Sequence, residues 1–164
     1  MTILSCADID LSKLQQLLGR YNLIIHQVNE SEKIPGSWFG EPEAGIIENN
    51  LYIRPDTPVH SALHESCHYI CMSAERRASL HTNAGGDYDE ENGVCYLSII
   101  LSDFLAEFGR ERMFSDMDEW GYTFRLGSSQ AWFEKDANDA YVWLLKHQLI
   151  HADGTPTWSV NTFF

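Results

Sequence analysis

The sequence is poor in basic residues. Of its 164 residues, 11 are Lys or Arg and 24 are Asp or Glu, which gives a formal net charge of −13 at pH 7. A field of this sign repels the phosphates of nucleic acids and the headgroups of anionic lipids. We therefore expect neither a nucleic acid nor a membrane surface as a partner.

Long apolar runs are also missing. The best one, residues 94–101, is interrupted by Ser98 and is far shorter than the roughly 18 residues that a membrane-spanning helix needs. The first eight residues hold no basic residue and end at Asp8, which does not fit a secretion signal. The protein is therefore expected in the cytoplasm, with its four cysteines as reduced thiols: Cys6, Cys67, Cys71 and Cys95.

No internal repeat, low-complexity tract or Pro/Ser-rich linker divides the chain. A chain of this length can bury roughly 68–70% of its unfolded surface, so it needs no disulfide or metal merely to fold. Hydrophobic residues make up 44% of the sequence, which is near the globular norm. We expect a single domain across residues 1–164.

Apolar residues recur with helical spacing along much of the chain. A short helix is predicted over residues 10–19, where Gly19 is the stop. Three principal helices follow, over residues 58–74, 89–108 and 129–149. Thr57 is the predicted N-cap of the first of these, with Pro58 as its first residue. The stripe of the next helix is expected to face the core: Val94, Leu97, Leu101, Phe104 and Phe108.

Two segments have the composition of β-structure. Residues 21–28 predict one strand, and residues 44–54 predict two short strands around a turn at Asn49-Asn50. We expect an α+β domain in which a short sheet packs beside the helix at 58–74. Residues 51–53 are expected to form the edge strand beside the cleft, where an extended substrate could pair with it.

The remaining segments give weaker signals. Residues 75–88 predict a loop, and residues 109–128 give no assignment. Trp38 and Phe39 lie in a loop-like stretch but are expected to pack inward. Five other aromatic residues are expected in the core rather than in a binding surface: Trp120, Tyr122, Phe124, Trp132 and Trp143.

One motif carries the chemistry. Residues 64–68 read His-Glu-Ser-Cys-His, an HExxH sequence. Helical residues four apart lie about 5–6 Å from each other, so His64 and His68 can bind one zinc ion, and Glu65 can reach a water on that ion. Random shuffling of this composition would give an HExxH string in roughly one chain in forty, so the string alone is moderate evidence for a metal site. Its position inside a capped helix that follows a strand strengthens that evidence. The alternative is two ordinary helix histidines, with Glu65 as a surface ion-pair partner.

With this motif the chain resembles the zincin metallopeptidases, across about residues 50–108. Their metzincin branch implies Gly where this chain has Cys71 and a third histidine where it has Ala74, so that branch fits poorly. The gluzincin branch implies a third-ligand Glu from a downstream helix, and residues 87–91 begin such a helix. Small single-domain zincins of this layout include bacterial regulators that cleave repressors. The resemblance implies a zincin-like fold and a bound Zn²⁺.

Glu91 is the preferred third ligand. It shares a helix face with small residues, which would let its helix approach the HExxH helix closely. Glu90 remains an alternative, because Gly93 follows three residues later, where several gluzincin families place a small residue. Cys95 stands four residues after Glu91, where the family has an Asp. Three further candidates stay open: Asp87, Asp89 and His81. The acidic run could also serve only to stabilise a helix N-terminus.

Other polar residues near the motif are expected to have secondary roles. His60 precedes His64 by one turn, but three successive turns cannot easily enclose one tetrahedral ion, so we expect it in the cleft wall or behind a ligand. Cys67 and Cys71 are expected to be small buried hydrophobic residues. Four residues could stabilise an oxyanion, with no basis for a choice: Tyr122, Arg125, His81 and His147.

These residues predict a cytoplasmic zinc metallohydrolase that acts on a peptide or protein. His64, His68 and Glu91 would hold Zn²⁺, and Glu65 would be the general base toward a zinc-bound water. One rival is a zincin-like domain that binds metal for structure or partner recognition without turnover. Another is a regulatory or interaction module with no metal. Loss of a structural metal would unfold the protein, whereas loss of a catalytic one would leave it folded and inactive.

Overall fold

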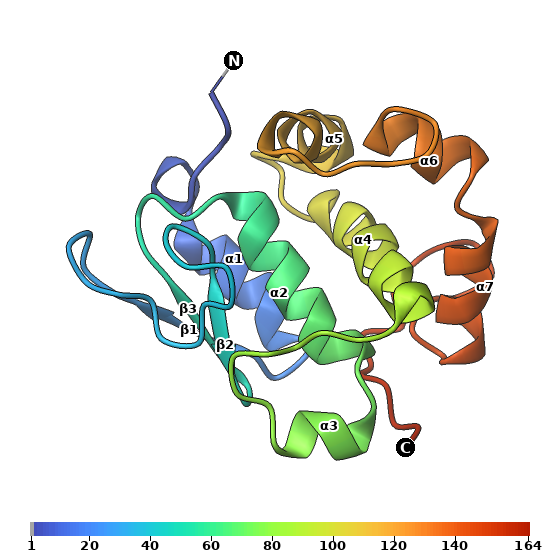
Figure 1. The fold of residues 1–164 in the computed structure, drawn as a ribbon, viewed down its shortest axis with the longest axis horizontal. Helices are drawn as coiled ribbons and strands as arrows, with labels where there is room; N and C mark the ends of the chain where they lie inside the picture. Colours follow the sequence, from blue (N-terminus) through green and yellow to red (C-terminus); the bar gives the residue numbers. More distant parts are fainter. Residues whose placement is uncertain (1) are drawn as a thin grey trace.

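A small β-sheet and seven α-helices build the fold of residues 2–164, which a computed structural model describes (Figure 1). The predicted α+β class is confirmed, although there are more helices than the sequence indicated. The elements are, in chain order, the 3-10 turn η1 (Cys6–Asp8), α1 (Leu11–Gly19), β1 (Ile24–Gln27), β2 (Gly45–Ile47), β3 (Asn50–Ile53), α2 (Val59–Cys71), α3 (Ala74–Ala78), α4 (Tyr88–Ser102), α5 (Gly109–Trp120), α6 (Ser129–Lys135) and α7 (Asn138–Lys146).

The sheet has the strand order β1-β3-β2, so β3 is the central strand. β1 runs parallel to β3, with Ile24 opposite Asn50, and β2 runs antiparallel to it. The prediction that residues 51–53 form an edge strand is therefore wrong. Leu51 and Ile53 are fully buried, as suits a central strand. The predicted turn correctly identified β2 and β3 as a hairpin. No local pattern reveals that β1, whose Ile24 pairs with Asn50 26 residues later, lies on the other side of β3.

The outer edge of β2 is also occupied. The Ile46 amide donates to the Gly36 carbonyl over 3.2 Å, and the Ile46 carbonyl accepts from the Thr82 amide over 2.9 Å. Two residues further on, the Glu48 amide donates to the Leu80 carbonyl over 2.8 Å. The outward backbone groups of Ile46 are thus satisfied within the chain, and the segment after α3 lies along this edge.

Helix α2 lies between the sheet and α4 (Figure 1). All of its residues except Tyr69 are buried. Its N-cap is Pro58, one residue later than predicted, because the Thr57 hydroxyl accepts from the Arg54 amide over 2.8 Å instead of capping the helix. The helix ends at Cys71, and the short α3, which was not predicted, follows it.

Small residues lie on the face of α4 that carries Glu91. Ser98 and Ser102 follow Glu91 by about two and three helical turns, and both are buried. Their hydroxyls bond to carbonyls of their own helix, as in the 2.8 Å bond from Ser98 to Cys95. The short side chains leave little bulk between the two helices without leaving buried polar atoms unpaired. The expected close approach of the two helices is confirmed.

The second half of the chain departs from the predicted helix boundaries. Helix α4 ends at Ser102, and the turns that follow place Phe104 at the surface against Trp158, so Phe104 does not continue the core stripe. Helix α5 was not predicted. The predicted helix over residues 129–149 is two helices, which break at Asp136 and Ala137. No helix among residues 2–164 is long and apolar enough to cross a membrane.

Gly93 allows α4 to pack against α7. A Cβ atom at this position would lie 2.8 Å from Cε3 of Trp143. We predict that Gly93→Ala lowers the free energy of unfolding by about 1–3 kcal/mol, because the overpacked contact outweighs the better helix propensity of Ala. Gly19→Ala is the matched control, since its Cβ would make only an ordinary 3.5 Å contact with Gln15. Equal stability of the two variants in urea titrations would contradict this packing.

Candidate metal centre

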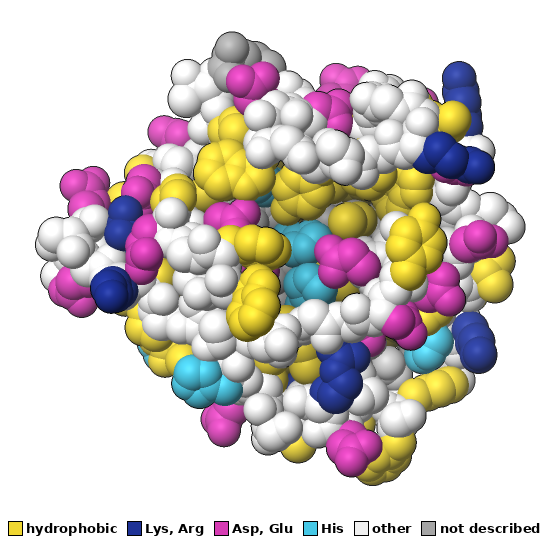
Figure 2. Space-filling model, in the orientation of Figure 1, with side chains coloured by type: hydrophobic (Ala, Val, Ile, Leu, Met, Phe, Trp, Pro, Cys, Tyr) yellow, Lys and Arg dark blue, Asp and Glu magenta, His cyan; other side chains and the backbone are white. Residues whose placement is uncertain are grey.

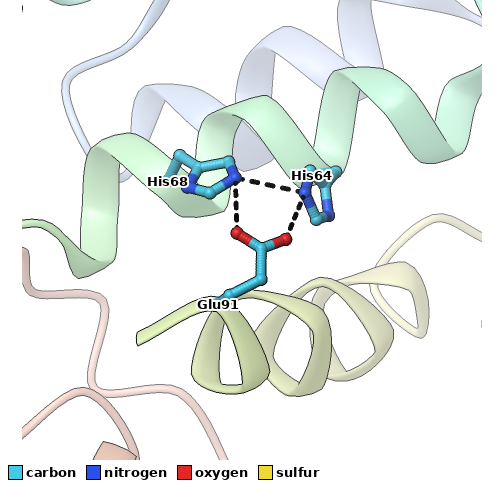
Figure 3. Close-up of side chains that lie close together, drawn as sticks. All are labelled: His64, His68 and Glu91. Atoms are coloured by element: carbon cyan, nitrogen blue, oxygen red, sulfur yellow. Dashed lines mark hydrogen bonds and ion pairs between the residues drawn. The ribbon is translucent and has the colours of Figure 1, made fainter. Parts of the chain in front are cut away.

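Helices α2 and α4 bring the three predicted metal ligands together (Figure 3). His64 and His68 extend from one face of α2, and Glu91 reaches toward them from the first turn of α4. Nε2 of His64 lies 3.1 Å from one carboxylate oxygen of Glu91, and Nε2 of His68 lies 3.2 Å from the other. The two Nε2 atoms are 3.2 Å apart. The three side chains therefore converge on one point.

The distances between these nitrogen and oxygen atoms match those between the ligands of a tetrahedral zinc ion. Zinc binds imidazole nitrogen and carboxylate oxygen at about 2.0–2.2 Å, which places neighbouring ligand atoms about 3.3–3.5 Å apart in a regular tetrahedron. Two imidazoles and one carboxylate are also a common ligand set of catalytic zinc, which leaves one position open. The residues present fit the ion.

Hydrogen bonds alone do not give every polar atom of His64, His68 and Glu91 a suitable partner. If each Nε2 donates its proton to Glu91, the two protonated Nε2 atoms of His64 and His68 face each other at 3.2 Å. The Nδ1 atoms of both rings are buried and have no hydrogen-bond partner among residues 2–164. A cation between the three ligand atoms would use both Nε2 lone pairs and the carboxylate charge at once.

The protonation of the cluster follows from burial and charge. Burial, followed by the charge of His64, lowers the pKa of His68 to about 4. Burial also opposes the charge of His64, but the adjacent Tyr122, Cys95 and Glu91 side chains outweigh it and raise that pKa. The pKa of Glu91 is lowered: burial raises it, but the hydrogen bond and charge of His64 prevail. These shifts favour a charged His64 beside a neutral His68 and an ionised Glu91.

Glu65 lies beside the cluster and faces the same cleft as His64. It is buried and forms no hydrogen bond with another side chain among residues 2–164. Burial raises the pKa of its carboxyl group to about 7, although the nearby His64 lowers it. A carboxyl group with this pKa can both accept and return a proton near neutral pH.

Glu90, the alternative ligand, points elsewhere. Its carboxylate forms a 2.7 Å ion pair with Arg76 of α3 and packs against Gly86. Glu90 is buried, so this ion pair neutralises a charge that would otherwise be costly. Glu91, in contrast, has a side chain that is 43% exposed and faces the cleft.

The other ligand candidates are absent from the cluster as well. The Asp87 carboxylate caps α4 by accepting from the Glu90 amide over 2.9 Å. Nδ1 of His81 lies 2.7 Å from the Thr82 hydroxyl. Asp89 is exposed. The structure groups none of these three with the histidines.

His60 is fully buried behind the cleft rather than in its wall. Its ring contacts the rings of Trp120 and Tyr122, and its Nδ1 lies 3.5 Å from the Tyr122 hydroxyl. Burial, followed by the charge of His64, lowers its pKa to about 3. His60 is therefore a neutral packing partner of two cleft residues.

The four residues proposed to stabilise an oxyanion differ in their position relative to the cleft. Tyr122 and Arg125 line the cleft. His81 is exposed beside Thr82, and His147 stacks on Trp143 away from the cluster. Arg125 is held by a bidentate ion pair with Asp136, so Tyr122 is the remaining candidate on the cleft, and its hydroxyl makes one long 3.5 Å hydrogen bond with His60.

The four cysteines are free and buried, as predicted for reduced thiols. Burial raises the pKa values of Cys67 and Cys71. Cys95 lies on the cleft beside Glu91 and adjoins His64. None of them belongs to the group of candidate ligand atoms among residues 2–164.

Three hollows meet at Glu91 and form the cleft, in which histidines are visible between hydrophobic and acidic side chains (Figure 2). Hollow A, about 180 Å³, lies between Trp38, Phe39 and residues 82–85. Hollow B, about 290 Å³, is lined by Phe39, Trp120 and Tyr122. Hollow C, about 490 Å³, lies on the α6–α7 side of Glu91.

The aromatic residues of this cleft were not recognised from the sequence. Trp38 and Phe39 are 58% and 73% exposed, so the prediction that they pack inward is wrong. Trp120 is also partly exposed and donates a 2.9 Å hydrogen bond to the Glu43 carboxylate across hollow B. A short aromatic pair in a Gly- and Pro-rich loop has no periodicity, so nothing local shows which way it faces.

Comparisons with protein-family models, with curated proteins and with solved structures found no match.

We predict that the protein binds one zinc ion and that Glu91→Gln lowers its zinc affinity by at least about a hundredfold, because it removes a charged ligand. Glu90→Gln is the matched control: it removes the neighbouring charge from the Arg76 ion pair and should retain zinc. Metal content by mass spectrometry and competition with a chelator dye measure both. Zinc loss in Glu90→Gln but not in Glu91→Gln would reverse the assignment.

Zinc binding should also depend on pH. The proton on His64 must leave before the imidazole can bind zinc, so affinity should rise by about tenfold per pH unit below the raised pKa of His64. Titrations with a chelator dye between pH 6 and 8, corrected for protonation of the dye, test this. An affinity independent of pH would show that no such proton is displaced.

Proposed function

We propose that the protein is a zinc-dependent hydrolase, most specifically a peptidase with a zincin-like fold. The observation that carries this proposal is the convergence of His64, His68 and Glu91, with Glu65 beside them on the same cleft. A structural zinc site usually has four protein ligands, and this cluster supplies three. When bound, zinc supplies Lewis acidity, which polarises a carbonyl and lowers the pKa of a coordinated water.

Glu65 acts as the general base in this proposal. Its carboxylate faces the cleft and has no competing hydrogen bond to another side chain among residues 2–164. It takes a proton from the water that attacks the scissile carbonyl and returns it to the leaving nitrogen. The raised pKa of about 7 suits both transfers.

Tyr122 acts as the hydrogen-bond donor to the developing oxyanion. Its ring packs against His64 with centroids 5.6 Å apart, and it lines hollows B and C. Burial raises the pKa of its hydroxyl to about 12, so it keeps its proton throughout the neutral range. A neutral donor in a partly dry cleft stabilises negative charge effectively.

The zincin-like assignment draws on the helix arrangement. The HExxH helix α2 packs between a small sheet and a second helix that carries the third carboxylate. The cluster lies at a cleft rather than within the hydrophobic core, so removal of zinc should leave the protein folded. Unfolding on chelation would favour the rival in which the metal has only a structural role.

Glu65→Gln should retain one zinc ion and lose activity by about 10²–10⁴-fold, because the amide cannot accept the proton. Cleavage can be detected by mass spectrometry of a mixed peptide library incubated with the zinc-loaded protein. Glu30→Gln is the control, since it changes an exposed carboxylate that lines none of the three hollows and should leave the chemistry intact. Full activity in Glu65→Gln would refute the role of this residue.

A further inference from the structure

The sheet offers no free edge beside the metal centre. Many peptide-binding sites hold an extended chain by pairing it with an edge strand. Here β3 is central, and the outward groups of Ile46 in β2 bond to Gly36 and Thr82. Within residues 2–164, a substrate backbone therefore has no strand edge to pair with on this side of the sheet, which directs attention to its side chains.

One side of the cleft is apolar. Trp38 and Phe39 are exposed at hollow A, together with His64 and His68. Phe39 continues into hollow B, which Trp120 closes from α5. Large apolar side chains exposed next to a cleft mark a binding surface more often than a scattered surface residue does. This side is suited to a large apolar side chain of the substrate.

The other side of the cleft combines carboxylates with aromatic rings. Hollow C is lined by Glu91, Asp136 and Asp139 and by four aromatic side chains: Tyr88, Tyr122, Phe124 and Trp132. Aromatic faces and carboxylates together attract Lys and Arg side chains. The cation in this lining is Arg125, and Asp136 already pairs with it. Asp139 forms no ion pair within residues 2–164.

We propose that the substrate is a polypeptide with a large apolar residue on one side of the cleaved bond and a Lys or Arg on the other. The apolar side chain packs against Trp38 and Phe39, and the cationic side chain enters hollow C beyond Glu91. This assignment rests on the proposed function of the same site. The net charge of −13 further favours cationic and disfavours acidic substrates.

Binding to the zinc-loaded Glu65→Gln variant tests the proposal without turnover. The probes are fluorescein-labelled hexapeptides, otherwise Ala and Gly, with a central Phe-Lys, Phe-Ala or Phe-Glu pair in both orders. In anisotropy titrations the better order of Phe and Lys should bind about tenfold more tightly than its Glu counterpart, with the Ala probe between them. Zinc per chain, measured on the same sample, distinguishes the outcomes. One bound zinc with equal binding of all probes overturns the substrate assignment alone, whereas no bound zinc overturns the proposed function.

Two substitutions in the same background should act in opposite directions. Asp139→Asn should weaken binding of the Lys probe several-fold, because it removes an unpaired carboxylate from hollow C. Arg125→Ala should strengthen it, because it frees Asp136. Glu30→Gln is the charge-matched control, since Glu30 is exposed and lines none of the three hollows. An equal effect of Asp139→Asn and Glu30→Gln would overturn hollow C as the cation subsite.

Discussion

The close contact between α2 and α4 is the constraint on which the site depends. Ser98 and Ser102, on the same face of α4 as Glu91, allow the two helices to pack closely while their hydroxyls stay bonded to their own backbone. The close packing of the two helices places the Glu91 carboxylate beside the Nε2 atoms of His64 and His68 on α2. Larger side chains in the contact would move Glu91 away from His64 and His68 and separate the ligands without changing any of them.

Around this contact, several buried polar atoms have no hydrogen-bond partner within residues 2–164. Buried polar atoms usually have a partner, yet the Nδ1 atoms of His64 and His68 have none among residues 2–164. Glu65 likewise faces the cleft without a hydrogen bond to another side chain. Three of the five buried side-chain atoms without a partner belong to the α2 histidines, His60, His64 and His68, and the other two lie on Tyr21 and Glu90.

Local patterns in the sequence predicted those parts of the molecule that depend on local spacing. The helix around residues 64–68 and the face of α4 that carries Glu91 both follow from helical periodicity. The position of β3 within the sheet depends on a partner distant in sequence, and the break between α6 and α7 coincides with the pairing of Asp136 with Arg125. The exposure of Phe39 depends on how its loop is held. Such features are set by tertiary contacts, which no local pattern encodes.

X-ray absorption at the zinc edge of the purified protein, prepared without chelators, tests the proposed centre most directly. The proposal predicts a first shell of nitrogen and oxygen at about 2.0–2.2 Å with the multiple-scattering signature of two imidazoles. Sulfur at about 2.3 Å would instead indicate cysteine ligation and contradict the His64, His68 and Glu91 centre. A protein that takes up no zinc would contradict it equally.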